Sequence, residues 1–109
     1  MNVPSLSYAS TSILLAIGTG YRYGFDVMDI TGLPSGTVYP ALRRLEQSGL
    51  IASKWEAGAV AQRELRPPRK YYSIARAGET ALGGALKRYP LLERMSSQLP
   101  QKTPQKTGS

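Results

Sequence analysis

The stretch from residue 33 to residue 51 reads Leu33-Pro34-Ser35-Gly36-Thr37-Val38-Tyr39-Pro40-Ala41-Leu42-Arg43-Arg44-Leu45-Glu46-Gln47-Ser48-Gly49-Leu50-Ile51. Val38, Leu42 and Leu45 recur at spacings of four and three, which places them on one face of an α-helix. Hydroxyl and guanidinium side chains of the same segment fall on or near the opposite face. The glycine at position 49 ends the predicted helix, because glycine is common just past a helix C-terminus. Such a helix has one face for folding and one for a partner.

The start of this helix has two candidate N-caps, Ser35 and Thr37, whose hydroxyl groups can accept an unpaired backbone N–H. Pro40 has no backbone N–H and is tolerated best within the first helical turn. A cap at Thr37 keeps Pro40 in that turn, whereas a cap at Ser35 places it slightly too deep and loses one hydrogen bond. The sequence leaves both alternatives open.

Two helices are expected before this segment. Residues 5–18 carry apolar side chains at spacings of three and four, which predicts one buried helical face. Residues 23–30 predict a short second helix with Phe25 and Met28 facing inward and Val27 as a further inward-facing candidate. Residues 31–34 contain Gly and Pro and predict the turn into the next helix.

Two strands are expected after it. Residues 50–56 and 69–74 predict an antiparallel hairpin, because their Tyr, Trp and Ile side chains suit a pleated surface. We call residues 50–74 the wing. Residues 57–68, the wing tip, contain one Gly and two Pro and predict a flexible loop.

A last helix is expected from about Arg76 to Leu99. Its apolar residues step by three or four along the chain: Leu82, Leu86, Tyr89, Leu92, Met95 and Leu99. Such a stripe beyond a compact domain predicts pairing with a partner helix. Pro90 should kink or split the helix, and Gly83-Gly84 should weaken it by up to about 1 kcal/mol per Gly.

The expected fold is therefore mainly α with a small β-hairpin, a winged helix-turn-helix followed by a C-terminal dimerisation helix. The expected divisions are a DNA-binding domain over residues 1–75, the dimerisation helix over 76–99 and a disordered tail over 100–109. The tail is polar and contains a direct repeat with no apolar residue to bury.

Composition narrows the function classes. The 109 residues include no Cys and no His, so thiol nucleophiles, disulfides and the commonest metal ligands are absent. The seven carboxylates are scattered without an obvious pairing, which argues against an enzyme, and no cofactor or metal is expected. No apolar run approaches the roughly 20 residues that cross a bilayer, and the start lacks the basic region of a signal peptide. A cytoplasmic protein is expected.

The net charge of +7 is unevenly placed. Eight of the 14 basic residues lie between positions 33 and 76, against three of the seven acidic ones. A localised positive field attracts polyanions such as nucleic acid. Charge alone fits a solubilising surface about as well, so the interpretation depends on the elements that carry it.

The expected order of elements, three helices followed by a strand, the wing tip, a second strand and a last helix, indicates which polyanion the positive charge binds. The major groove of B-DNA admits one α-helix, and the base edges exposed there carry a unique pattern of donors and acceptors. Arg43 and Arg44 are about 100° apart on a helix, so one is expected on DNA and the other in a surface ion pair. The expected contacts to double-stranded DNA are Ser35, Thr37, Tyr39, Arg43, Arg44, Arg63, Arg66, Arg69 and Lys70.

These motifs resemble those of the PadR family of bacterial transcriptional regulators over about residues 12–80. The resemblance is carried by Tyr23-Gly24-Phe25-Asp26-Val27, by Gly36-Thr37-Val38-Tyr39-Pro40-Ala41-Leu42-Arg43-Arg44-Leu45-Glu46, by Ser48-Gly49-Leu50-Ile51 and Lys54-Trp55, and by Pro68-Arg69-Lys70-Tyr71-Tyr72-Ser73-Ile74 leading to Ala77-Gly78.

The resemblance implies a homodimer that binds a near-palindromic operator, usually as a repressor. It implies base recognition by Thr37, Tyr39 and one of the two adjacent arginines, and wing contacts from Arg69 and Lys70. The dimer interface is expected at Leu82, Leu86, Tyr89, Leu92 and Met95. Family members often respond to small aromatic or drug-like, cationic effectors, and the candidate pocket is bordered by Trp55, Leu82, Leu86 and Tyr89.

Three features depart from the family pattern. Ala75-Arg76 stands where the family often has Thr-Glu, the last helix is interrupted by Gly83-Gly84 and Pro90, and the short length leads us to expect no large C-terminal domain. These departures bear on the dimer and on the effector pocket. The main alternative is a winged-helix adaptor that binds proteins without specific DNA binding, and a third reading is a sensor whose ligand switch is the main role.

Overall fold

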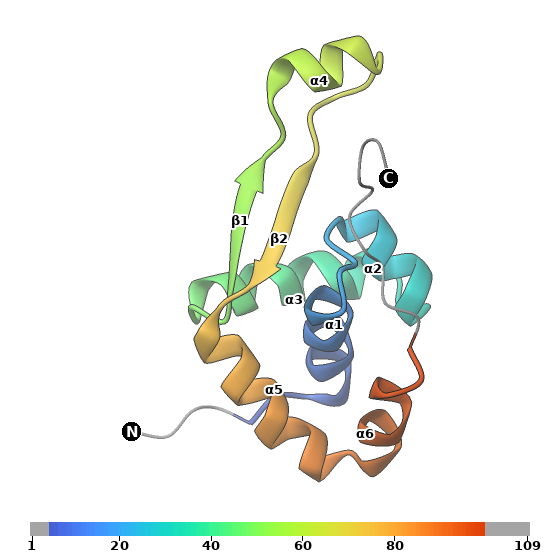
Figure 1. Cartoon of the computed structure of the whole chain (residues 1–109), viewed down its shortest axis with the longest axis vertical. Helices are drawn as coiled ribbons and strands as arrows, with labels where there is room; N and C mark the ends of the chain where they lie inside the picture. Colours follow the sequence, from blue (N-terminus) through green and yellow to red (C-terminus); the bar gives the residue numbers. More distant parts are fainter. Residues whose placement is uncertain (1–4, 100–109) are drawn as a thin grey trace.

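The structure is a computed structural model that describes residues 5–99. The elements in order are α1 (Tyr8–Gly18), α2 (Gly24–Thr31), α3 (Ser35–Gln47), β1 (Ile51–Trp55), α4 (Gly58–Arg63), β2 (Lys70–Ile74), α5 (Arg76–Arg88) and α6 (Pro90–Ser96). Figure 1 shows a hairpin that projects from a group of helices and carries α4 at its outer end. The predicted winged helix-turn-helix, mainly α with one small hairpin, is confirmed. No helix within residues 5–99 is long and apolar enough to cross a membrane.

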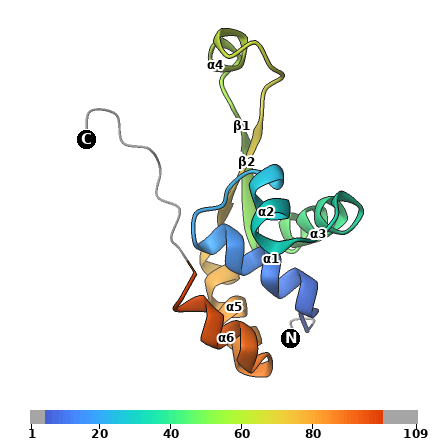
Figure 2. The ribbon, with the colours of Figure 1, turned by 90° about the vertical axis from the view of Figure 1, so that its right-hand side faces the viewer.

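The core forms around α1. Ile13 and Leu14 of α1 are fully buried, and the predicted inner face of α3, formed by Val38, Leu42 and Leu45, packs into the same cluster. Helix α1 also contacts α2, α5 and β2. Figure 2 shows α3 on one side of α1, with α5 and α6 on the other. The core therefore fixes which face of α3 points outward.

The prediction that Phe25 faces inward is wrong. Phe25 is 73% exposed, whereas Val27 is fully buried. Helix α2 begins at Gly24, and residues two apart on a helix point about 200° apart. The burial of Val27 therefore turns Phe25 to the surface.

Both N-cap hypotheses for α3 are also wrong. The helix begins at Ser35, and the residue before it, Pro34, makes no side-chain capping bond. The carbonyl of Pro34 instead accepts hydrogen bonds from the N–H groups of Thr37 and Val38, at 2.9 and 3.0 Å. Pro40 lies inside the helix, beyond the first turn, so its missing N–H leaves one helical hydrogen bond unmade.

The wing pairs β1 with β2 in antiparallel register, from Ile51 opposite Ile74 to Trp55 opposite Lys70. The expectation of an irregular loop at the wing tip is wrong, because residues 58–63 form α4. Ala61 of this short helix is buried. The wing tip is thus a folded unit, tied down by contacts described below.

One residue, Ala75, joins the wing to α5. The N–H of Ala75 donates to the carbonyl of Leu50 at 3.0 Å. A Cβ added at Gly78 would lie 2.0 Å from that same carbonyl oxygen, so α5 starts in close contact with the base of the wing. The helix has no side-chain N-cap, and this contact with Leu50 fixes where it starts.

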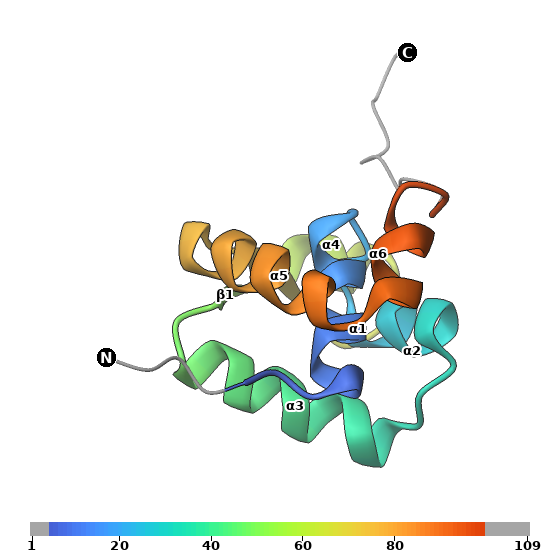
Figure 3. The same cartoon turned by 90° about the horizontal axis from the view of Figure 1, so that it is seen from below.

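The last helix is split at Pro90, as predicted, into α5 and α6. Helix α6 turns away from the axis of α5 after Tyr89 and stays in contact with it, and Figure 3 shows α6 beyond the end of α5. The hydroxyl of Tyr89 donates to the carbonyl of Leu6 at 2.9 Å, and its ring meets that of Tyr8 edge to face at 5.4 Å. Leu92 is buried, and Leu82 packs against the core. Part of the expected apolar stripe therefore packs within the chain. The predicted disordered tail lies outside the described residues.

Candidate nucleic-acid interface

The outer face of α3 carries the predicted recognition residues. Tyr39 is 43% exposed, Ser35, Arg43 and Arg44 are exposed, and Thr37 is half-buried. Within residues 5–99, neither arginine forms an ion pair, so the surface ion pair expected for one of them is not formed there. Both guanidinium groups are available to an external anion.

Tyr39 is positioned by the first residue of α2. A Cβ added at Gly24 would lie only 2.7 Å from both Cε1 and the hydroxyl oxygen of Tyr39. The absence of a side chain at Gly24 therefore lets the aromatic ring rest on the backbone of α2. This contact explains why the Tyr-Gly-Phe motif and the Tyr39 motif belong together, although the sequence alone gave Gly24 no role.

Glu46 joins the end of α3 to both strands of the wing. Its Oε2 accepts a hydrogen bond from Ser53 of β1, and its Oε1 lies 3.6 Å from Nζ of Lys70 on β2. The same Nζ lies 5.7 Å from the ring centre of Trp55. Lys70 is thus partly engaged within the chain, and Glu46 fixes the angle between α3 and the wing.

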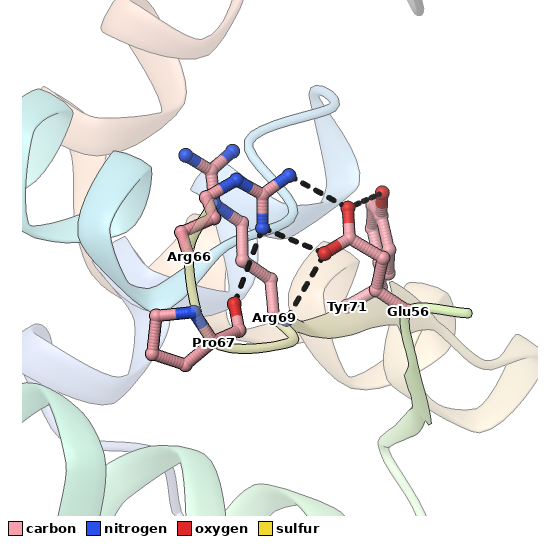
Figure 4. Close-up of polar contacts among 5 residues, drawn as sticks. All are labelled: Glu56, Arg66, Pro67, Arg69 and Tyr71. Atoms are coloured by element: carbon pink, nitrogen blue, oxygen red, sulfur yellow. Dashed lines mark hydrogen bonds and ion pairs between the residues drawn. The ribbon is translucent and has the colours of Figure 1, made fainter. Parts of the chain in front are cut away.

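Glu56 organises the wing tip, as Figure 4 shows. Arg66 donates from Nη1 and Nη2 to the two carboxylate oxygens, at 2.6 and 2.8 Å. The N–H of Arg69 and the hydroxyl of Tyr71 each donate to Glu56 at 3.3 Å. The Glu56 side chain is 3% exposed. Paired, bidentate hydrogen bonds are the strong form of this interaction, so Arg66 holds the wing tip closed.

The ionisation of this cluster follows its contacts. Hydrogen bonding from Arg66 outweighs burial and lowers the pKa of Glu56 from 4.5 to about 2. A hydrogen bond with Tyr23, together with burial, raises the pKa of Tyr71 to about 12. At neutral pH the cluster therefore holds an ionised carboxylate, a guanidinium and a neutral phenol.

A groove of about 560 Å³ runs between α2, α3 and the wing. Tyr39 lines one side, and Arg69 and Lys70 line the other, with Phe25 at the α2 edge. The guanidinium of Arg69 lies 4.7 Å from the ring centre of Tyr23. The groove thus brings together Tyr39, Arg66, Arg69 and Lys70, four of the residues that the sequence predicted.

The other predicted residues lie apart from the groove. Arg63 ends α4 at the outer end of the wing and is exposed. Trp55 is 63% exposed at the end of β1 away from α5, whereas Tyr89 follows α5. The four residues expected to border an effector pocket, including Leu82 and Leu86, therefore do not form one pocket within a single chain.

Comparison with known proteins gives this surface a context. The sequence profile of the transcriptional regulator PadR-like family matches residues 13–84, which is more than half of the chain. The chain belongs to the PadR-like family. No curated protein matches it. The resemblance drawn from the motifs is confirmed, and this PadR-like chain belongs to a family of transcription regulators.

Solved structures agree with the fold of this PadR-like chain. A PadR-like transcription factor from Bacteroides fragilis is 25% identical, with a TM-score of 0.63, 84% of this chain covered and 88% of the other. A PadR family regulator from Clostridium difficile is 23% identical, with a TM-score of 0.66 and coverage of 84% and 97%. One from Eggerthella lenta is 24% identical, with a TM-score of 0.57 and coverage of 87% of each chain.

Proposed function

We propose that this PadR-like regulator binds a near-palindromic operator as a homodimer and acts as a repressor. The observation that carries the proposal is the outer face of α3, where the half-exposed Tyr39 and the unpaired Arg43 and Arg44 lie beside the wing. A rigid inner face and a polar outer face are what the major groove requires of a helix. A regulator of transcription acts on the chromosome, so we place it in the cytoplasm.

Each side chain then has a distinct role. Thr37 and Tyr39 lie in the N-terminal half of α3, where base contacts usually form. Ser35, at the start of the helix, suits a phosphate. Arg43 and Arg44 reach a phosphate and a guanine edge, and the wing supplies backbone contacts from Arg63, Arg69 and Lys70. Arg66 supports these contacts by holding the wing tip.

The dimer requires an exposed apolar surface. Leu91 and Met95 of α6 are 60% and 44% exposed, and Tyr8 is 48% exposed beside Tyr89. We assign these residues and Leu86 to the interface, and we assign Leu82 and Leu92 to the fold. A second copy could bring together the four residues of the expected effector pocket, so that a small aromatic or cationic ligand would bind between copies and release the operator.

The test is selection of a binding duplex from a random pool, followed by affinity measurements on that duplex and on an unrelated one. Tyr39→Ala should weaken binding to the selected duplex much more than to the unrelated one, as expected of a base contact. Lys70→Ala should weaken both alike and reduce the salt dependence by a slope of about 1. If the dimeric protein binds no duplex at low salt, the proposal fails and a protein-binding adaptor becomes the better explanation.

A further inference from the structure

Leu65 has an unusual backbone conformation at the wing tip. Its φ is 57°, and it is the only residue other than Gly with a positive φ within residues 5–99. Its side chain is 92% exposed. A left-handed conformation is unfavourable for a residue with a Cβ. An exposed leucine side chain also lacks the stabilising free energy that burial would give it. Within residues 5–99, no contact buries this leucine side chain.

The hydrogen bonds around Leu65 show why the conformation is needed. The N–H of Leu65 donates to Gln62, and the N–H of Arg66 donates to Ala61, each at 3.1 Å. These two bonds form the Schellman motif that ends a helix, and Gly is the usual residue at its left-handed position. Leucine therefore stands where the backbone alone would favour glycine.

The wing around Leu65 carries a net positive charge and lies toward the α3 side. Residues 56–70 contain four basic residues against two acidic ones, Glu56 and the exposed Glu64. Arg63 is exposed two residues before Leu65. Figure 2 shows the segment from α4 to β2 on the side of the wing where α3 lies. Arg66 and Pro67 line the groove that also contains Tyr39. The pair of Glu56 with Arg66 fixes this segment, so the leucine is held in a defined direction.

We propose that Leu65 inserts into the DNA minor groove next to the major groove that α3 occupies. This inference rests on the proposed DNA binding. The net positive charge of the wing favours a polyanion over an apolar protein surface, and apolar side chains inserted between base steps are a known way of unstacking and bending DNA. The operator should therefore carry a flexible pyrimidine–purine step opposite Leu65, because such steps unstack most easily.

The experiment uses the full-length protein and the duplex that it selects from a random pool. Leu65→Asn tests the contact, because Asn tolerates the left-handed conformation and removes the apolar group. Leu65→Met is the matched control, because it keeps an apolar side chain at the same backbone position. Leu65→Asn should weaken binding about tenfold per half-site, the effect of leaving one leucine in water, and so about a hundredfold for two half-sites, whereas Leu65→Met should stay within about twofold.

A second readout tests unstacking directly. 2-Aminopurine placed in turn at each step flanking the α3 site should fluoresce more at one step with the wild-type protein, and Leu65→Asn should abolish that increase. Limited proteolysis should show that the wing of Leu65→Asn is at least as resistant as that of the wild type. If the wild type binds its duplex but Leu65→Asn binds equally well with no fluorescence change in either, Leu65 does not contact DNA and the operator binding still stands. If the wild type selects no duplex, both inferences fail.

Discussion

Replacing Gly24 with Ala would separate the positioning of Tyr39 from the stability of the fold. The added methyl group would lie 2.7 Å from Cε1 and from the hydroxyl oxygen of Tyr39, and 2.9 Å from Cζ. Comfortable carbon contacts are about 3.5–4.0 Å, so the ring must move by about 1 Å. The obstructed atoms are at the end of a flexible side chain, so the ring yields and the backbone stays in place.

The magnitude follows from this displacement. A hydroxyl group that moves by about 1 Å loses the geometry of a hydrogen bond, which contributes about 1 kcal/mol. In the proposed dimer, two half-sites double the loss to about 2 kcal/mol, which is about thirtyfold in Kd. Ala is a better helix residue than Gly, so the free energy of unfolding should change by less than about 1 kcal/mol.

The assay pairs fluorescence anisotropy on the selected duplex with urea unfolding. Gly58→Ala is the matched control, because Gly58 also begins a helix and an added Cβ there meets open space. It should leave the Kd unchanged. Wild-type affinity in Gly24→Ala, together with a clear loss in Tyr39→Ala, would refute the idea that Gly24 positions the ring. A large loss of stability in Gly24→Ala would refute the assumption that the ring yields.

Three further predictions concern stability. The pKa of Glu56 is about 2, against an ordinary 4.5, so the stabilisation from its pair with Arg66 should be complete above about pH 5 and lost as the pH falls toward 2. Proteolysis of the wing across this range should show the change, and Glu56→Gln should remove it. Gly78→Ala should cost about 3 kcal/mol in urea unfolding, because its methyl group would meet the backbone oxygen of Leu50 at 2.0 Å. Leu92→Ala should cost about 2 kcal/mol independently of protein concentration, and a cost that grows on dilution would instead place Leu92 in the dimer interface.

The sequence predicted the parts of the fold that depend on periodicity and on proline. The spacing of Val38, Leu42 and Leu45 identified the inner face of α3, and Pro90 identified the break between α5 and α6. These signals are local, since each depends on residues within two turns of a helix. The outer face of α3 followed from them, which is why Tyr39, Arg43 and Arg44 could be named in advance.

The remaining features depend on contacts between distant residues. The sequence pattern assigns no role to Glu46 or Glu56, two acidic residues in a basic region. In the structure, Glu46 fixes the wing against α3, and Glu56 closes the wing tip. Helix α4 is too short to show a helical period, and its position depends on the pair between Glu56 and Arg66. The inward prediction for Phe25 fails because α2 has only eight residues, and so short a helix has too few turns for the apolar spacing to identify its buried face.

The single-residue connection at Ala75 makes the wing and α5 one rigid arm. In the proposed dimer, a ligand or mutation that rotates the two copies of α5 against each other would carry both wings with them and change the fit to two half-sites. Such coupling is reciprocal, because any factor by which a ligand weakens the operator complex is also the factor by which the operator weakens ligand binding. The stiffness of this junction would then set how strongly ligand binding changes the affinity for DNA. A more flexible junction should leave ligand binding and operator binding intact but remove the coupling between them.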